Sequence, residues 1–455
     1  MILNTALWSA LALPACGSDE TSKTREPSTG DDSSSDDDNE GDDDTDSTGD
    51  AGSTKKDAGN TGTPKTDAGK VDASAPLDAG MVATGKSDGG QSEGEPGDAG
   101  KDTDTGAAPS GKPPFNPSGA PLMAPENTWT YFEFADTKCR DGSPAGISVN
   151  MSTKSKNLMI YMEAGGACFE SLTCLVSPPS VGSQTPLGDV GIFDRTNNDN
   201  PVKDWSYVYV PYCSGDVHLG SNDASIVDGV DGTQHFMGRV NLESFLNRVV
   251  PTFADAEKVL VTGASAGGFA ASASSEVVNW AFAAKPKIYM LDDSGPPMSQ
   301  DYLPKCLIDI WKKTWSLDKG IGADCGSDCT PDGDFEMEAL AHILKVGTNM
   351  RFAVLESDAD SIIRGFYGIG TDNGTNDCMG TLLVTPMDAT VFKNGLLDLR
   401  KRVMGDDRFS SYYPESDQHT WIVSQDFYSA PAGGVRIVDW VANMLDDKPG
   451  MHVGP

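Results

Sequence analysis

Residues 115–455 carry two alternating patterns of apolar and polar positions, and these patterns predict strands followed by helices. Residues 129–134 and 146–151 alternate apolar and polar side chains, like strands with one buried face. Residues 157–163 and 205–212 form runs with few charges, which is typical of strands buried on both faces. The first part of this region therefore predicts strands that are suited to a buried sheet.

Further along the same region, segments with the apolar spacing of helices alternate with segments that predict strands. Apolar residues between 242 and 250 recur at i, i+3, i+4, i+7 and i+8, the spacing of one helix face. Residues 258–262 predict a short strand that ends at Gly263, and the small residues 266–278 then favour a helix. Further strands are expected at 288–291 and 352–355, and further helices at 336–344 and 435–445. This alternation predicts an α/β fold with a mostly parallel sheet flanked by helices, in which catalytic groups lie beyond the carboxyl ends of the strands.

Composition separates the first 114 residues from this domain. They carry 24 acidic and 9 basic side chains and, after residue 15, almost no large apolar ones. Such a segment buries too little apolar surface to offset its ordering entropy, so residues 17–114 are predicted to be a disordered linker rich in Asp, Gly, Ser and Thr. The net charge of −34 argues against nucleic-acid binding, which needs a basic surface. No apolar run reaches the ~20 residues of a membrane span.

The N-terminus predicts export. Residues 1–15 form an apolar segment that is too short to span a membrane, and we interpret residues 1–16 as a signal peptide. Its end, Leu-Pro-Ala-Cys-Gly at 13–17, resembles a bacterial lipobox, in which the cysteine becomes lipidated. The expectation is a protein lipid-anchored through Cys16 at the bacterial cell surface or outer membrane, or secreted. The alternative is an ordinary cleaved signal in which Cys16 has no role.

The cysteine count supports export. The chain has nine cysteines, and removing Cys16 leaves an even number, which in an exported chain suggests up to four disulfides. Their pairing does not follow from spacing. A metal site at Cys325 and Cys329 is disfavoured, because there is no second pair with ligand spacing and no nearby histidine. The eight remaining cysteines are Cys139, Cys168, Cys174, Cys213, Cys306, Cys325, Cys329 and Cys378.

The strongest chemical signal is Gly-Ala-Ser-Ala-Gly at 263–267, a G-x-S-x-G motif between a predicted strand and a predicted helix. A nucleophile elbow needs this context, because a sharp strand-to-helix turn projects the serine from the sheet edge with a helix N-terminus behind it. We therefore predict Ser265 as a nucleophile. The alternative is a glycine-rich turn that serves only packing.

A nucleophilic serine needs a base, and the chain has five histidines. In this fold class the triad runs serine, acid, histidine along the chain. His218 and His235 precede the serine, so the order excludes them. His342 lies on a helix before the strand expected to supply the acid, and His452 lies in the C-terminal tail. His419, in a loop before the last predicted helix, is the predicted base.

The acid should follow a late strand between the serine and His419. Residues 351–356 predict that strand, and both Asp358 and Asp360 follow it. One carboxylate is expected to orient the imidazole, and the other to be solvated or to cap a helix.

An acyl-transfer site also needs amide donors for the oxyanion. The glycine-rich segment that follows the strand at 157–163 supplies Gly165 and Gly166, and the amide of Ala266 follows the nucleophile. We predict these three as the oxyanion hole. The alternative for the glycines is a tight turn beside a Cys168–Cys174 disulfide, and both readings are compatible.

Six ordered segments carry a family resemblance. They are Cys-Arg-Asp-Gly-Ser-Pro-Ala-Gly at 139–146, Glu-Ala-Gly-Gly-Ala-Cys at 163–168, Val-Pro-Tyr-Cys-Ser-Gly-Asp at 210–216, Gly-Ala-Ser-Ala-Gly-Gly at 263–268, Asp-Ser-Gly at 293–295 and His-Thr-Trp at 419–421. With them the chain resembles the pectin acetylesterase/Notum family of serine carboxylesterases over about residues 125–445. In that family the acid opens a D-S/E-x-x element, so the resemblance implies Asp360. It also implies the disulfides Cys139–Cys213 and Cys168–Cys174.

The chain departs from the family pattern at two positions beside the oxyanion loop. Ala164 stands where the family has glycine, and Ala167 stands where the plant enzymes have tryptophan. Both substitutions bear on the shape of the acyl pocket.

The resemblance implies an α/β-hydrolase-like domain at 115–455 that acts as an exported serine carboxylic ester hydrolase without a cofactor or metal. Its expected substrate is O-acetylated pectin or a related O-acylated polysaccharide. The alternatives are a Notum-like deacylase of longer acyl esters, and a catalytically silent surface protein that binds carbohydrate. Acyl length and oligomeric state are left open.

Overall fold

A computed structural model describes residues 115–455 apart from residues 187, 371–377 and 379–384. The predicted signal peptide (1–16), the lipidation of Cys16 and the predicted linker (17–114) lie outside the described residues.

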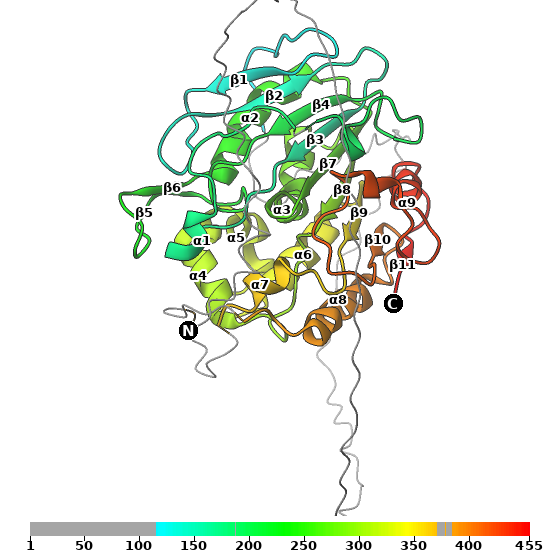
Figure 1. Cartoon of the computed structure of the whole chain (residues 1–455). Helices are drawn as coiled ribbons and strands as arrows, with labels where there is room; N and C mark the ends of the chain where they lie inside the picture. Colours follow the sequence, from blue (N-terminus) through cyan, green and yellow to red (C-terminus); the bar gives the residue numbers. More distant parts are fainter. Residues whose placement is uncertain (1–114, 187, 371–377, 379–384) are drawn as a thin grey trace, which may run out of the picture. The chain divides into compact units, whose positions relative to one another are not determined.

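The described residues form a nine-stranded sheet in the order β1-β2-β4-β3-β7-β8-β9-β10-β11, with β1 at one end and β11 at the other (Figure 1). β1 pairs with β2 and β2 with β4 in antiparallel register, whereas every pair from β4 to β11 is parallel. The mostly parallel sheet predicted from the sequence is confirmed. The strands are β1 (Thr130–Phe134), β2 (Ala145–Asn150), β3 (Leu158–Met162), β4 (Ser206–Val210), β7 (Lys258–Ala264), β8 (Lys287–Asp293), β9 (Met350–Leu355), β10 (Phe409–Tyr412) and β11 (His452–Val453), with a separate pair β5 (Asn222–Ser225) and β6 (Gln234–Phe236).

Side chains that alternate along the central strands build two separate cores. Along β3, Leu158, Ile160 and Met162 belong to the larger core, whereas Met159 and Tyr161 belong to the smaller one. This division follows from the period of two in a strand, which sends successive side chains to opposite faces. It explains why the central strands read as uninterrupted apolar runs.

The helices divide between these two cores. α2, α3, α4, α6 and α8 bury side chains in the larger core, and α9 buries its apolar face in the smaller one. The helices are α1 (Ser171–Leu175), α2 (Gly238–Thr252), α3 (Ala266–Ala281), α4 (Lys305–Trp315), α5 (Ile321–Cys325), α6 (Phe335–Val346), α7 (Ile363–Tyr367), α8 (Ala389–Val403) and α9 (Ile437–Leu445). None of the described helices is long and apolar enough to cross a membrane.

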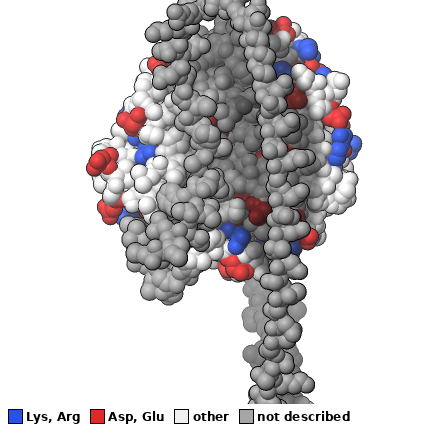
Figure 2. Space-filling view, in the orientation of Figure 1, with Lys and Arg blue, Asp and Glu red and all other residues white. Residues whose placement is uncertain are grey.

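Four disulfides join the eight cysteines of the described residues. Cys139–Cys213 and Cys168–Cys174, the two pairs implied by the family resemblance, are confirmed. The pairing that the sequence left open is Cys306–Cys378 and Cys325–Cys329. Four disulfides are typical of proteins that fold in an oxidising compartment, which fits an extracellular protein. On the face visible in Figure 2, acidic and basic side chains of the described residues are interspersed.

Candidate active site

Ser265 occupies a strained turn between β7 and α3. Its φ of 56° and ψ of −118° are rare for a residue with a side chain, and such strain is found where the surrounding structure holds a functional group in place. A Cβ atom on Gly267 would collide with the backbone of Met162, so only glycine lets the helix pass this close to β3. The Ser265 amide donates to the Asp293 carbonyl at 2.8 Å, which ties the turn to the end of β8.

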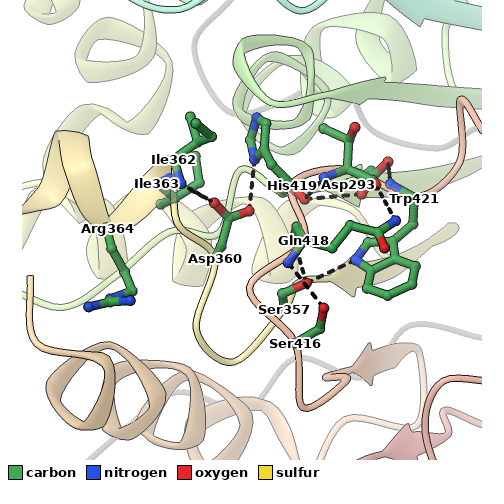
Figure 3. Close-up of polar contacts among 12 residues, drawn as sticks. Asp293, Ser357, Asp360, Ile362, Ile363, Arg364, Ser416, Gln418, His419 and Trp421 are labelled. Atoms are coloured by element: carbon green, nitrogen blue, oxygen red, sulfur yellow. Dashed lines mark hydrogen bonds and ion pairs between the residues drawn. The ribbon is translucent and has the colours of Figure 1, made fainter. Parts of the chain in front are cut away.

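His419 and Asp360 lie in direct contact (Figure 3). His419 Nδ1 is 2.7 Å from Asp360 Oδ2, and the Asp360 side chain is fully buried. Asp360 Oδ1 accepts hydrogen bonds from the backbone amides of Ile362 and Ile363, both at 2.8 Å. These amides favour the ionised carboxylate and fix its plane, so Asp360 can hold the imidazole in one orientation.

Asp358, the other candidate acid, points elsewhere. Its Oδ2 lies 2.9 Å from Lys393 Nζ on α8, and its Oδ1 accepts from the Ser416 amide at 3.2 Å. The structure therefore brings Asp360 to His419 and pairs Asp358 with a lysine.

Asp293 connects the nucleophile turn to the histidine loop. Its Oδ2 accepts from the amides of Trp421 and Ile422 at 2.8 and 2.9 Å, and Ser294 Oγ accepts from the Thr420 amide at 3.1 Å. Burial raises the pKa of Asp293 to about 6, and the two amides oppose that rise. The sequence marked the Asp-Ser-Gly segment only as part of a family resemblance, because its role depends on contacts more than 120 residues away.

A second set of contacts holds the same loop from β9. Ser357 Oγ donates to the Gln418 carbonyl at 2.6 Å and accepts from Trp421 Nε1 at 3.1 Å (Figure 3). His419 is thus fixed on both sides. Ser265 Oγ forms no hydrogen bond with His419 among the described residues; a bond between nucleophile and base often forms only in the substrate complex.

The other histidines are engaged away from this pair. His218 is buried with Nε2 2.9 Å from the Glu163 carbonyl, and burial lowers its pKa to about 4. His235 contacts Asp223, His342 contacts Asp328 and His452 contacts Ser411 Oγ, each at 2.8–2.9 Å. These placements agree with the chain-order argument for His419.

Two of the predicted oxyanion donors, Gly165 and Gly166, lie on a braced loop, and the third, Ala266, is the first residue of α3. Among the described residues, the backbone amides of Gly165, Gly166 and Ala266 have no hydrogen-bond partner, as donors awaiting an oxyanion require. Tyr212 Oη donates to the Gly166 carbonyl at 3.0 Å and accepts from the Val217 amide at 2.8 Å. The Gly166 peptide is therefore oriented by a buried phenol.

The next residues of this loop are fixed as well. The Cys168 amide donates to the Gly215 carbonyl at 2.7 Å, and its carbonyl accepts from Trp315 Nε1 at 2.8 Å. The Cys168–Cys174 disulfide closes the loop onto α1. Together these contacts fix the segment that carries Gly165 and Gly166.

Replacing Tyr212 with phenylalanine should loosen this loop. We expect Tyr212→Phe to lower kcat on an ester substrate about tenfold with little change in KM, because amide donors aimed at the oxyanion act mainly in the transition state. Leaving the Val217 amide without a partner should also cost about 1–3 kcal/mol in the free energy of unfolding. The measurements are steady-state kinetics and urea unfolding. Tyr289→Phe, which loses a 2.9 Å bond to Asp447, is the control and should keep kcat; an equal loss in both variants would contradict the bracing role.

An apolar pocket opens beside Ser265. The space that its atoms leave unfilled is about 900 Å³ when the part open to solvent is counted. Most of the lining side chains come from α3, α4, α6 and α7, others come from α5 and from loops, and Ala167 and Ala266 are among the lining residues. One acidic side chain, Glu336, lines it, and burial raises the pKa of Glu336 to about 7. Sequence reasoning missed this pocket because its walls come from helices separated by about 100 residues. Its apolar lining includes Val217, Leu219, Phe269, Trp311, Trp315, Leu317, Ile321, Phe335, Leu340, Ile343, Ile363 and Phe366.

Comparisons with known proteins agree with this geometry. Residues 128–335 match the family model described as Pectinacetylesterase. The chain is 34% identical over 141 residues to the palmitoleoyl-protein carboxylesterase notum2 of Xenopus laevis, and 30% identical over 143 residues to the human palmitoleoyl-protein carboxylesterase NOTUM. These matches cover 29% of this chain and 28% and 27% of the relatives, so the chain matches less than a third of their length.

A solved structure shares the fold over a longer span. The structure of the Wnt deacylase Notum from Drosophila superposes with a TM-score of 0.54 at 18% identity, covering 70% of this chain and 93% of that one. This likeness confirms the α/β-hydrolase-like fold. Ser265, Gly165 and Gly166 lie within the family-model match, whereas Asp360 and His419 lie beyond it.

Proposed function

We propose that this chain is a member of the pectin acetylesterase/Notum family and an exported carboxylic ester hydrolase with Ser265 as its nucleophile. The observation that carries this proposal is the 2.7 Å contact between His419 and the buried Asp360, on a loop that Asp293 ties to the Ser265 turn. Fluorophosphonate labelling of Ser265, with turnover of a p-nitrophenyl ester, tests it.

The proposed reaction has two half-steps. Ser265 Oγ attacks the acyl carbonyl while His419 Nε2 accepts its proton, and Asp360 stabilises the imidazolium. The amides of Gly165, Gly166 and Ala266 bind the oxyanion. His419 then protonates the leaving alcohol, and water activated by the same histidine releases the carboxylic acid. The proton of Ser265 thus passes through His419 to the leaving alcohol, and the proton taken from water passes through His419 back to Ser265 Oγ.

The shape of the pocket bears on the acyl group. A cavity lined almost wholly by apolar side chains beside the nucleophile suits an extended hydrocarbon chain better than an acetyl group. We therefore place the longer-acyl alternative ahead of pectin deacetylation. Acetate release from acetylated pectin remains the direct measurement for the polysaccharide substrate.

A p-nitrophenyl ester series from acetate to palmitate should show this preference. Each methylene that enters the pocket is worth ~0.8 kcal/mol, so kcat/KM should rise about fourfold per methylene until the pocket is full. Ala339→Phe, which fills the pocket from α6, should lower kcat/KM on long esters about 100-fold and leave the acetate ester nearly unchanged.

Ala341→Phe provides the matched control, because Ala341 is exposed on the same helix. This variant should keep the wild-type profile. If the acetate ester is the best substrate and Ala339→Phe does not change the order of the esters, the substrate would instead carry a short acyl group.

A further inference from the structure

A buried carboxyl group that the mechanism does not use lies against the proposed triad acid. Glu356 follows β9, and its side chain is fully buried. Among the described residues, no N–H or O–H group donates to either of its carboxyl oxygens. The polar group within hydrogen-bonding reach of it is the carboxyl of Asp360.

Glu356 takes part in no ion pair among the described residues. The charges of three carboxyl groups, those of Asp360, Asp292 and Asp293, act on it. From α7 and from the residue after β10 come the phenols of Tyr367 and Tyr413. Burial and these carboxylates together raise the pKa of Glu356 well above its usual range.

Two cationic groups lie near this cluster but are engaged by others. Arg400 of α8 packs over the Tyr413 ring, at 4.3 Å from the ring centroid, and donates to Ser411 Oγ and to C-terminal carbonyls. His419 faces Asp360 and lies close enough to Asp293 to lower its pKa.

Two carboxyl groups in contact cannot both be ionised in a dry site, so the pair must hold a proton. The Asp360 carboxylate accepts hydrogen bonds from two backbone amides and from the imidazole N–H, and these three donors favour its charged form. Glu356 receives no donor among the described residues, so the charged form is favoured on Asp360 and the proton on Glu356.

We propose that Glu356 is a neutral carboxylic acid that donates its O–H to the Asp360 carboxylate and thereby positions the triad acid. Glu356 touches neither substrate nor the reacting atoms, so it is a positioning residue. The inference rests on the proposed function for its effect on turnover, but the protonation state of Glu356 does not.

Two substitutions separate the donor from the bulk of the side chain. Glu356→Gln keeps an N–H donor in the same place, and Glu356→Met keeps the volume without a donor. We expect Glu356→Met to lower kcat on a p-nitrophenyl ester by about tenfold or more with KM unchanged, and Glu356→Gln to rescue kcat to within about threefold of wild type. An equal loss in both variants would overturn the proposal.

The pH profile distinguishes a neutral from an ionised Glu356. If Glu356 is neutral, Glu356→Gln changes no charge, and the acid limb of kcat/KM stays where it is in wild type. An ionised Glu356 would raise the pKa of the nearby imidazole, and its removal would move the acid limb down by about one pH unit. That shift would overturn the proposal.

A stability measurement keeps the inference testable even without activity. A carboxyl that keeps its proton in the folded state but loses it on unfolding makes the free energy of unfolding fall as pH rises above about 4.3. Glu356→Gln removes this linkage, so its Tm relative to wild type should increase as the pH is raised from about 4 to about 8.

The matched control for this readout is Glu415→Gln on an exposed carboxyl. It should show no such trend. If the Tm of Glu356→Gln relative to wild type stays flat or falls as the pH rises, the proposal is overturned whatever the enzyme assay shows. Failure of the proposed function would be seen separately, as unchanged turnover in Ser265→Ala.

Discussion

Ser265→Ala is expected to lower kcat by about 10⁴-fold or more, because removing the nucleophile of a triad leaves only the oxyanion donors and substrate binding. The Ser265 side chain makes no hydrogen bond with the described residues, so its loss should not weaken the fold. The measurements are p-nitrophenyl ester hydrolysis, fluorophosphonate labelling and thermal unfolding. Label should be lost with activity while the cooperative transition persists.

Ser275→Ala is the matched control for this variant. Ser275 lies on the same helix, is fully buried and donates to the Ser272 carbonyl at 3.1 Å. It should keep the label and kcat within about twofold, with a small loss in Tm. Activity of Ser265→Ala within about tenfold of wild type would contradict the elbow assignment. A wild-type protein that neither takes the label nor turns over esters would favour the silent carbohydrate-binding alternative.

The central sheet was predictable because its strands are buried on both faces. β3, β4, β7 and β9 lie within or close to the predicted ranges, since a strand without a solvent face has few places for charge. β10 escaped prediction because Phe409–Tyr412 is four residues long with two serines in the middle. Its place in the sheet comes from pairing with β9, which the local sequence does not encode.

Two long helices, α4 and α8, were not predicted from the sequence. α8 contains Gly395 and buries Arg400, so its pattern does not resemble a simple amphipathic helix. α4 was missed although its apolar residues Leu307, Ile308, Trp311 and Trp315 recur at helical spacing. Both helices fill the larger core, and α4 also lines the acyl pocket.

Residues of the candidate site could be proposed from the sequence where a local motif or the order along the chain singles them out. Ser265 is flanked by the glycines that a strained strand-to-helix turn requires. His419 was proposed because it is the histidine whose position fits the order serine, acid, histidine along the chain. The choice between Asp358 and Asp360 depends on which way a short loop turns after β9, and neighbouring residues in the sequence do not determine that. The role proposed for Glu356 could not be predicted from the sequence either. It depends on the three-dimensional surroundings of the side chain, in which no described group donates a hydrogen bond to its carboxyl oxygens.

The two candidate acids should respond very differently to loss of their charge. Asp360→Asn removes the carboxylate that accepts from His419 Nδ1 and leaves the developing imidazolium unpaired. A comparable Asp→Asn change in a serine protease lowers turnover by ~10⁴, and we expect a loss of that order here. Asp358→Asn instead breaks the 2.9 Å contact with Lys393. It should lower the free energy of unfolding by about 1–3 kcal/mol while kcat stays within about threefold of wild type.

Each variant is the control for the other. Asp358 and Asp360 are both buried and lie two residues apart, and each is replaced by asparagine. Steady-state kinetics and urea unfolding of each should show a loss of catalysis without a comparable loss of stability for Asp360, and the reverse for Asp358. If Asp358→Asn were the inactive variant, the acid would have to move to Asp358 and the observed His419–Asp360 contact would not be the catalytic one. Mild effects in both would point instead to Asp293, which lies close enough to His419 for its charge to interact with the imidazole, or to a serine–histidine dyad that needs no third group.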